Sequence, residues 1–410
     1  MRCHNLEDLI GECLDSIVSQ PFDDYEVVLV NNASTDGSDA VCREYAAQCK
    51  RIRYHALEQQ TPSLQYGLKA SVGRYVHVVD GDDMLAERAY SPEVIGVLQN
   101  TQPDIAFGRF VALAHDKNVF NFVDSTYLPE KINHANIEAV LDYLQTCEPL
   151  HPPAWRFIFK RELYCEAMFT RFRAARKSIN AAKRADQIFS LLLLLNASAV
   201  HYFDKPLYVY RVRQSSSSRM GGASLAANFF TPLYEQMIMA EEQPSDAKRR
   251  YVNYCIDAWR YMYCVSLMSL DKEQLNEHIA DLQTYARNLP PGATIAVENA
   301  EALRNRLFDK VKKVCGALDT VYLVPTGNIG ACMFDILAQC GVSVLGYFDN
   351  DEQKSGMLLK GVPVRLPASI TEDVPAPIVI AAAYKTVRQN IKQQFVSLGV
   401  SEKNIIVMEL

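Results

Sequence analysis

The chain has 410 residues, 49% of them hydrophobic and 22% charged, and a formal net charge of -6. This length suggests two or three domains, and the acidic balance excludes a general nucleic-acid-binding protein, which needs a basic surface. The 11 cysteines are scattered without a CxxC pair, which argues against a disulfide framework or a zinc site and fits a reducing cytosol.

Helices and strands alternate in the first part of the chain. Apolar side chains at helical spacing predict helices at 6–20, 37–49 and 63–71. Apolar runs predict strands at 25–32, 52–57 and 74–83. This alternation predicts a layered α/β fold with a mostly parallel sheet.

The middle of the chain is more mixed. Strands are predicted at 104–113 and 199–213, with a helix at 185–197 between them. The longest apolar run, at 188–200, is too short to span a bilayer and predicts a buried helix. We therefore expect a cytoplasmic protein, and peripheral contact with the inner face of the plasma membrane stays open.

The rest of the chain divides into two parts. Residues 219–315 begin in a Gly/Ser-rich loop and continue as a helical region, whose aromatic and aliphatic stripes we interpret as packing faces rather than ligand sites. A strand, a glycine turn and a helix then open a new α/β unit at 316–410. We predict that this unit is a small Rossmann-like domain that folds on its own.

Three carboxylates follow the predicted strand in the stretch GRYVHVVDGDD, at Asp80, Asp82 and Asp83. Ligands bind at the carboxyl ends of the strands in open parallel sheets, because the loops there form a crevice. Carboxylates at such a point suit a hard cation such as Mg²⁺ or Mn²⁺, which offers its open positions to phosphate oxygens. The alternative is an acidic loop that caps the following helix.

A second polar segment follows the strand at 25–32, in the stretch VVLVNNASTDGSDA. A strand, a polar turn and a helix N-terminus together present backbone donors and small polar side chains to a nucleotide. Ser34, Thr35 and Asp36 would also make an ordinary helix cap. Both interpretations stay open on these residues alone.

Four motifs in the same order resemble family 2 glycosyltransferases of the GT-A fold. NNASTDGS stands where the family has DDGSTDGS, and GRYVHVVDGDD where it has GxYxxxLDxDD. AWRFIFKREL and PLYVYRVRQSS match the family's later elements. The resemblance covers roughly half the chain and implies a GT-A domain at 1–218, with a layered, mostly parallel sheet.

The resemblance implies transfer of a sugar, with inversion at the anomeric carbon, from a nucleotide-sugar donor to a hydroxyl of a glycan or glycolipid acceptor. A UDP-sugar is the expected donor, and surface-polysaccharide or glycolipid assembly is the expected context. Asp82 would be the main metal ligand, and Asp80 would meet the metal or the ribose. The other expected donor-binding residues are Asn32, Ser34 and Asp36 around the nucleoside, and Arg211 or Arg213 at the diphosphate.

An inverting displacement needs a base that takes the acceptor's proton. The family places it in a Glu-Asp pair at the start of a helix, and the matching positions here are Ala185 and Asp186. Asp186 is therefore the candidate catalytic base. The alternative is an ordinary acidic residue favoured by the helix dipole.

The chain departs from the family pattern at three places. Asn32 replaces the second acid of the first motif, and Leu64 stands where the family has an arginine that contacts the donor. The opening MRCHN matches only the end of the family's first strand. We therefore expect that this strand is missing from the chain, and that an upstream extension of about ten residues would restore the sheet.

A second nucleotide site is conceivable in the stretch PTGNIG. Gly327 and Gly330 form a glycine turn, and Asp349 follows about twenty residues later, at the spacing of an acid that binds a ribose. The first glycine of the full GxGxxG motif is replaced by Pro325, which favours a structural or docking module.

Two rival functions are compatible with these residues. A sugar nucleotidyltransferase shares the layered fold but needs a glycine-rich and basic N-terminal loop, which the sequence lacks. A non-catalytic relative that binds sugar nucleotides would explain the three departures.

Overall fold

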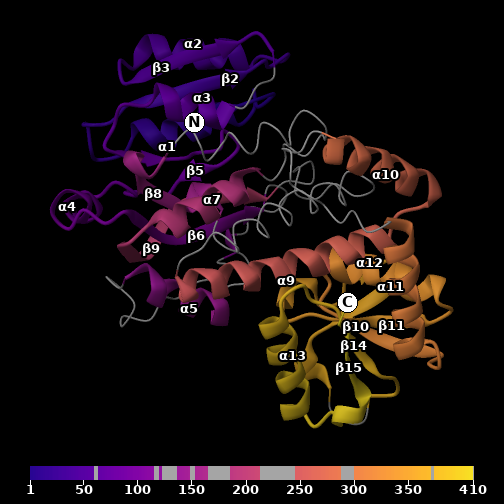
Figure 1. Cartoon of the computed structure of the whole chain (residues 1–410). Coiled ribbons are helices and arrows are strands. Elements are labelled where there is room, and N and C mark those ends of the chain that lie inside the picture. The colour runs from indigo at the N-terminus through magenta and orange to yellow at the C-terminus, as the bar shows by residue number, and fades with distance from the viewer. Residues whose placement is uncertain are drawn as a thin grey trace. The chain divides into compact units, whose positions relative to one another are not determined.

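The chain forms two compact units (Figure 1). The first comprises Met1–Phe172 and Asp186–Ser216, and the second comprises Arg173–Ala185 and Ser217–Leu410. The computed structural model describes residues 1–59, 63–114, 120–121, 136–147, 153–164, 185–212, 245–287, 300–370 and 374–409.

The first unit opens with a parallel three-stranded sheet in the order β1-β2-β3. These strands are β1 (Arg2–Cys3), β2 (Val27–Asn32) and β3 (Ile52–Leu57). The accompanying helices are α1 (Ile10–Val18), α2 (Ser38–Gln48) and α3 (Ser63–Ala70). The α/β alternation predicted for this part of the chain is confirmed.

A second, mixed sheet follows in the order β4-β8-β6-β9-β5, with β7 paired to β6. Only β6 and β9 pair in parallel, whereas the other ladders are antiparallel. The strands are β4 (Tyr75–His77), β5 (Met84–Leu85), β6 (Ile105–Ala114), β7 (Phe120–Asn121), β8 (Phe157–Lys160) and β9 (Val200–Val212). The helices are α4 (Pro92–Asn100), α5 (Ile137–Cys147) and α7 (Ala185–Asn196), with short 3₁₀ turns at Ala154–Arg156 and Arg161–Leu163.

The two sheets of the first unit meet at β1. Arg2 pairs with Val30 on one side and forms a parallel bridge to Asp80 on the other. Its N–H donates to the Val79 carbonyl at 3.2 Å, and its carbonyl accepts from the Gly81 N–H at 2.9 Å. β1 therefore lies between the carboxyl ends of β2 and of the segment that follows β4.

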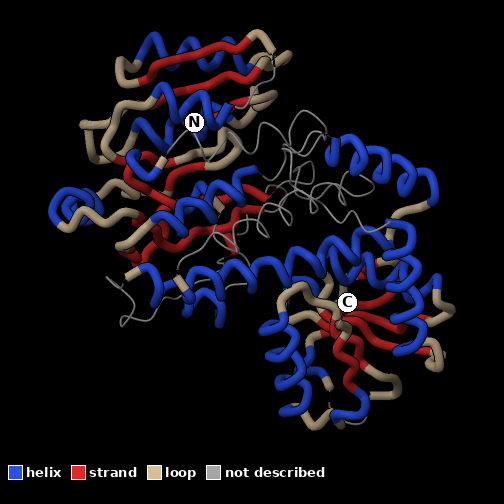
Figure 2. The backbone as a smooth tube through the Cα atoms, viewed as in Figure 1, coloured by secondary structure: helices blue, strands red, loops and turns tan. Residues whose placement is uncertain are grey.

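The second unit contains a six-stranded sheet in the order β12-β13-β11-β10-β14-β15. Figure 2 draws the strands of this sheet in red and the helices around them in blue. All neighbours pair in parallel except the edge strand β12. The strands are β10 (Thr320–Val324), β11 (Ser343–Phe348), β12 (Leu358–Leu359), β13 (Val362–Arg365), β14 (Ile378–Ile380) and β15 (Ile405–Val407). The first strand, β10, lies inside the sheet with later strands on both sides, as in a doubly wound, Rossmann-like fold.

The helices of the second unit share a core with this sheet. They are α9 (Asp246–Met268), α10 (Lys272–Arg287), α11 (Ala300–Cys315), α12 (Asn328–Gln339) and α13 (Lys385–Ser397). Val265 of α9 and Val311 of α11 are fully buried in one cluster with Leu323 of β10 and Ile336 of α12. The helical region and the C-terminal sheet are therefore packed together rather than joined by a simple linker.

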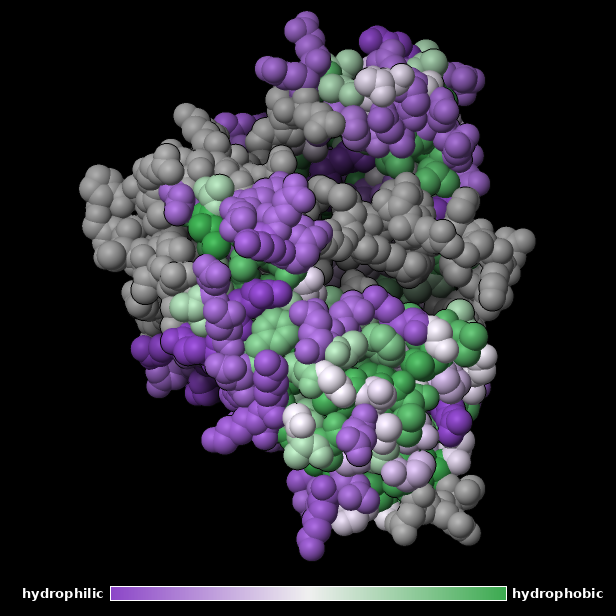
Figure 3. All heavy atoms as spheres, turned by 90° about the vertical axis from the view of Figure 1, so that its right-hand side faces the viewer, coloured by the Kyte–Doolittle hydropathy of each residue, from purple (hydrophilic) through white to green (hydrophobic). Residues whose placement is uncertain are grey.

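The face in Figure 3 carries hydrophilic side chains interspersed with hydrophobic ones. Within the described ranges, none of the helices combines the length and the apolar composition that a membrane span requires.

Candidate functional site

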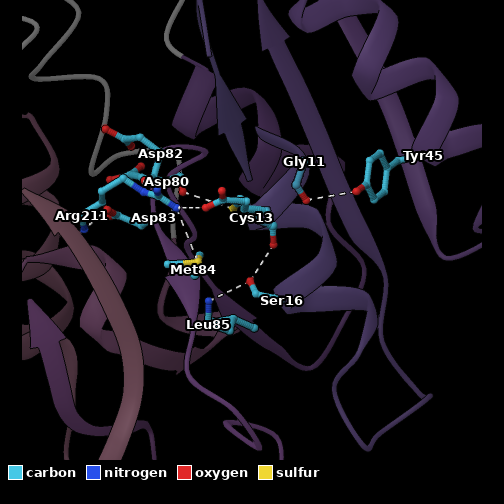
Figure 4. Close-up of polar contacts among 11 residues, drawn as sticks. Gly11, Cys13, Ser16, Tyr45, Asp80, Asp82, Asp83, Met84, Leu85 and Arg211 are labelled. Carbon is cyan, nitrogen blue, oxygen red and sulfur yellow. Dashed lines mark hydrogen bonds and ion pairs between the residues drawn. The ribbon is translucent and has the colours of Figure 1, made fainter. Parts of the chain in front are cut away.

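The three acidic residues after β4 lie in one turn but have different surroundings (Figure 4). Asp83 is buried, and its carboxylate accepts hydrogen bonds from the Tyr208 hydroxyl at 2.9 Å and from the Arg211 backbone N–H at 2.8 Å. Burial, together with the charges of Asp80 and Asp82, raises the pKa of Asp83 to about 8. Asp83 therefore ties the turn to β9.

Asp80 lies at the junction of the two sheets. Its carboxylate accepts from the Arg2 guanidinium, with Nε at 2.9 Å, and the two side chains form an ion pair. Its backbone N–H donates to the Tyr208 hydroxyl at 3.1 Å. Because the same hydroxyl donates to Asp83, Tyr208 is hydrogen-bonded to both ends of the acidic turn, at Asp80 and at Asp83.

Arg211 crosses the acidic turn from β9. Its side chain is only 5% exposed, and its Nε donates to the Asp82 carbonyl at 3.1 Å. Its Nη2 pairs with the carboxylate of Glu12 in α1 at 2.5 Å. The predicted diphosphate ligand thus lies beside the predicted metal ligands, whereas Arg213, the alternative, lies outside the described residues.

The acidic turn holds the carboxylates that the sequence predicts as metal ligands, Asp80 and Asp82. In the described part of the chain, no group of three His, Cys, Asp or Glu side chains is placed to hold a metal. Mg²⁺ is usually bound by one or two carboxylates together with substrate phosphates, and Asp80 and Asp82 are the residues that would hold such a cation.

The polar turn after β2 is held by the segment that follows β1. Ser34 Oγ accepts from the Asn5 N–H at 3.0 Å, and the carboxylate of Asp36 accepts from the Glu7 N–H at 3.1 Å. The carbonyl of Asn32 lies 2.9 Å from Nδ1 of His4. Two of the predicted donor-binding side chains, Ser34 and Asp36, therefore also shape the loop that would carry the nucleoside.

Sequence reasoning missed Asn31, the neighbour of Asn32. Asn31 is 3% exposed, and its side-chain amide donates to the Tyr54 hydroxyl at 2.9 Å. Its Oδ1 accepts from the Ser34 N–H at 3.1 Å. An amide at the end of an otherwise apolar strand was the available signal, because a buried polar side chain needs partners.

Tyr208 and Glu12 were missed as well. Tyr208 lies inside the quoted PLYVYRVRQSS motif, but its hydroxyl contacts to Asp80 and Asp83 depend on the pairing of β9 with β5.

The predicted base, Asp186, lies in the first turn of α7, where the sequence placed it.

The glycine turn of the second unit is closed by Asp349. Its carboxylate accepts from the backbone N–H of Thr326 at 3.1 Å and of Asp351 at 3.0 Å, and it also contacts the Thr326 hydroxyl and Lys354. A Cβ on Gly330 would lie 2.0 Å from the Pro325 carbonyl oxygen, whereas one on Gly327 would meet nothing within 4 Å. The arrangement accounts for Gly330 and Asp349 as structural residues of the β10–α12 turn.

Comparison with known proteins finds a family match for the N-terminal part of the chain. Residues 1–157 match the model of glycosyl transferase family 2. The chain is 30% identical over 227 residues to glycosyltransferase GlyA of Streptococcus pneumoniae, covering 53% of this chain and 30% of GlyA. It is 28% identical over 222 residues to the uncharacterized glycosyltransferase EpsJ of Bacillus subtilis, covering 52% of this chain and 60% of EpsJ.

The chain thus spans less than two thirds of the length of either relative. A crystal structure of S. aureus TarS residues 1–349 with UDP-GlcNAc is 16% identical with a TM-score of 0.48, covering 76% of this chain and 84% of that one. Residues 1–157, which are less than half of the chain, thus match glycosyl transferase family 2, and the α/β layers of this part agree with the GT-A fold that the resemblance implies.

Proposed function

We propose that the protein is a metal-dependent, inverting glycosyltransferase that uses a nucleotide-sugar donor, with a UDP-sugar as the expected substrate. The observation that supports this proposal is that two polar turns lie on either side of β1, where the two sheets of the first unit meet. Arg2 of β1 pairs with Val30 on one side and bridges to Asp80 on the other. The polar turn after β2, which would face the nucleoside, and the acidic turn are therefore about two strand spacings, or ~10 Å, apart.

The acidic turn would bind the donor diphosphate. Asp80 and Asp82 would hold Mg²⁺ or Mn²⁺, which when bound offsets the charge on the leaving nucleotide. Arg211 adds a buried guanidinium at the same turn, and its Nη2 could exchange Glu12 for a phosphate oxygen. The Tyr208 hydroxyl and the Arg211 N–H both donate to Asp83, and these bonds would hold the conformation of the acidic turn during ligand binding and release.

The remaining roles follow from the family resemblance. Asn32, Ser34 and Asp36 lie at the turn that would face the nucleoside. Asp186, at the start of α7, would take the proton of the acceptor hydroxyl as it attacks the anomeric carbon opposite the leaving group, which gives inversion. A glycan or glycolipid acceptor in surface-polysaccharide assembly is the context that the resemblance suggests.

One contact favours a second candidate, a relative that binds sugar nucleotides without transferring them. The Arg2 guanidinium lies on Asp80 and could substitute for a metal cation there. Leu64 and Asn32, which replace polar donor contacts of the family, point the same way.

A panel of nucleotide sugars titrated with and without Mn²⁺ tests both candidates. The transferase predicts Mn²⁺-dependent binding of one donor together with slow donor hydrolysis. Binding that needs no metal and gives no hydrolysis would support the non-catalytic relative, and the absence of binding by any donor would contradict both.

A further inference from the structure

An ion pair between Glu12 and Arg211 joins α1 to β9 beside the acidic turn. Nη2 of Arg211 lies 2.5 Å from the carboxylate of Glu12, although the two residues are 199 positions apart in the chain. A carboxylate carries the same sign of charge as a phosphate group, and a guanidinium binds either of them. Glu12 therefore holds the nitrogen of Arg211 that a diphosphate at the acidic turn would use.

Arg211 is held firmly, whereas the side chain of Glu12 is not. The Arg211 side chain is 5% exposed, its Nε donates to the Asp82 carbonyl at 3.1 Å, and its Nη2 also lies 3.6 Å from the Met84 sulfur. The Glu12 side chain is 61% exposed, and Arg211 is the one partner that the described part of the chain gives to its carboxylate. Rotation of the Glu12 side chain into water therefore suffices to release the arginine, which stays in place.

The helix that carries Glu12 is itself hydrogen-bonded to the acidic turn and to β5 (Figure 4). Cys13 Sγ donates to the Asp80 carbonyl at 3.5 Å, and Ser16 Oγ accepts from the Leu85 N–H at 3.0 Å. Glu12 lies in the first turn of this helix, where the helix dipole favours a carboxylate whether or not it is paired. The exchange therefore requires a new rotamer of one side chain and no movement of the helix.

The charges around the acidic turn oppose an anion while Glu12 is present. Besides the buried Asp83, the site contains three carboxylates and two guanidinium groups, which belong to Glu12, Asp80, Asp82, Arg2 and Arg211. Removal of the charge of Glu12 would balance the two signs. Charges a few ångströms apart near a protein surface interact strongly enough to change an affinity roughly tenfold or more. A divalent cation on the acidic turn would overcome the same excess of negative charge.

We propose that Glu12 is an exchangeable counter-ion of Arg211, which a diphosphate group displaces only after a divalent cation has bound to the acidic turn. Without the cation, Glu12 neutralises the arginine and repels the anion. With the cation in place, the diphosphate binds Arg211 and the Glu12 side chain turns into water. This order of binding rests on the proposed function, which places the donor diphosphate at this turn. The alternative role of the pair is a structural tie between α1 and β9.

The test measures binding of inorganic pyrophosphate to the full chain by calorimetry, with a chelator present so that no divalent cation remains. Glu12→Gln removes the charge and keeps the shape of the side chain. We expect this variant to bind pyrophosphate at least roughly tenfold more tightly than the parent chain. The matched control is Asp15→Asn, which removes one charge from the same helix at a carboxylate that accepts from the Tyr45 hydroxyl at 2.7 Å. The control should keep the parent's affinity.

A double variant shows whether the gain in affinity belongs to Arg211. Glu12→Gln combined with Arg211→Gln removes both charges of the ion pair, so that no unpaired buried charge is left. We expect the double variant to lose the gain. Thermal melting followed by circular dichroism checks that each chain is folded. If the Glu12→Gln variant is not folded, Glu12→Ala replaces it, because alanine removes the same charge and favours a helix.

Three results would overturn the proposal. These are no gain in pyrophosphate affinity on removal of the Glu12 charge, an equal gain in the Asp15→Asn control, or a gain that survives the loss of Arg211. A lower melting temperature of the Glu12→Gln variant without a gain in affinity would leave the pair as a structural tie.

Binding of a nucleotide sugar to the parent chain with Mn²⁺ is measured separately, because it tests the proposed function. Donor binding by the parent without a gain in the Glu12→Gln variant would contradict the exchange and leave the proposed function standing. A gain in the variant without donor binding by the parent would support the exchange of Glu12 for an anion and contradict the proposed function.

Discussion

At the scale of single residues, three neighbouring acids in the acidic turn have three different surroundings. Asp83 is buried under β9, Asp80 pairs with Arg2, and Asp82 has its carbonyl bound by Arg211. The sequence showed the cluster and its place at a strand end. It could not show which acid turns inward, because that depends on Tyr208, 125 residues further along the chain.

Replacing Tyr208 with Phe tests the support of this turn. The change removes the hydroxyl that donates to Asp83 and accepts from the Asp80 N–H, so that Asp83 keeps only its bond from the Arg211 N–H and the Asp80 N–H loses this acceptor. We expect a loss of about 1–3 kcal/mol in the free energy of unfolding, measured with urea. Tyr210→Phe on the same strand is the matched control. Equal stability of the two variants would contradict the assigned role.

His77 gives a prediction about pH. Its Nε2–H donates to the Trp155 carbonyl at 2.9 Å and its Nδ1 accepts from the Tyr90 hydroxyl at 3.0 Å, which is the pattern of a neutral, half-buried ring. Burial lowers its pKa to about 4, below the ordinary value near 6.5.

Because the unfolded chain binds the proton first, the stability due to neutral His77 is complete above pH 6.5 and falls as the pH drops towards 4. The expected loss is about 3 kcal/mol. His77→Gln retains a donor and an acceptor and should flatten this part of the profile. An unchanged slope in chemical denaturation between pH 6.5 and 4 would argue against the assignment.

At the scale of elements, apolar periodicity located most helices and strands of the first unit. The strand predicted at 52–57 is β3 (Ile52–Leu57), and the helix predicted at 63–71 is α3 (Ser63–Ala70). The direction of the strands could not be predicted in the same way, because the apolar runs of β8 and β9 suit a parallel or an antiparallel strand. The predicted strand at 74–83 is shorter, because the chain leaves β4 to form the acidic turn.

The turn between β10 and α12 gives a prediction for an element. Gly330→Ala would bring a methyl group within 2.0 Å of the Pro325 carbonyl oxygen unless the backbone moves. We expect a loss of about 1–3 kcal/mol in stability, as for other overpacked sites. Gly327→Ala has open space around it and should cost clearly less. Equal melting temperatures of the Gly330→Ala and Gly327→Ala variants would show that the backbone of the turn moves to accommodate the methyl group.

At the scale of the whole molecule, the family resemblance found the first unit, whereas the organisation of the second was harder to predict. The aromatic stripes of α9 were interpreted as packing faces, and Tyr261 and Val265 do pack in the core of the C-terminal sheet. Composition could not show which surface these stripes would cover, because the partners lie more than fifty residues away in sequence.

This shared core changes what is expected of fragments. A fragment of residues 318–410 lacks α9 and α11, so Leu323 and Ile336 would lose part of their cover. We expect residues 245–410 to unfold cooperatively and residues 318–410 to be markedly less stable, as measured by circular dichroism during heating. A fully stable short fragment would restore the boundary near 316 that the sequence suggested.

The most direct test of the proposed activity is the Asp82→Ala variant, assayed for donor binding by calorimetry with and without Mn²⁺. Asp309→Ala, at an exposed position of α11, is the matched control. We predict that the Asp82 variant folds normally but loses the Mn²⁺-dependent part of donor binding, whereas the control retains it. Donor and Mn²⁺ binding by the Asp82 variant at the parent's affinity would contradict the account.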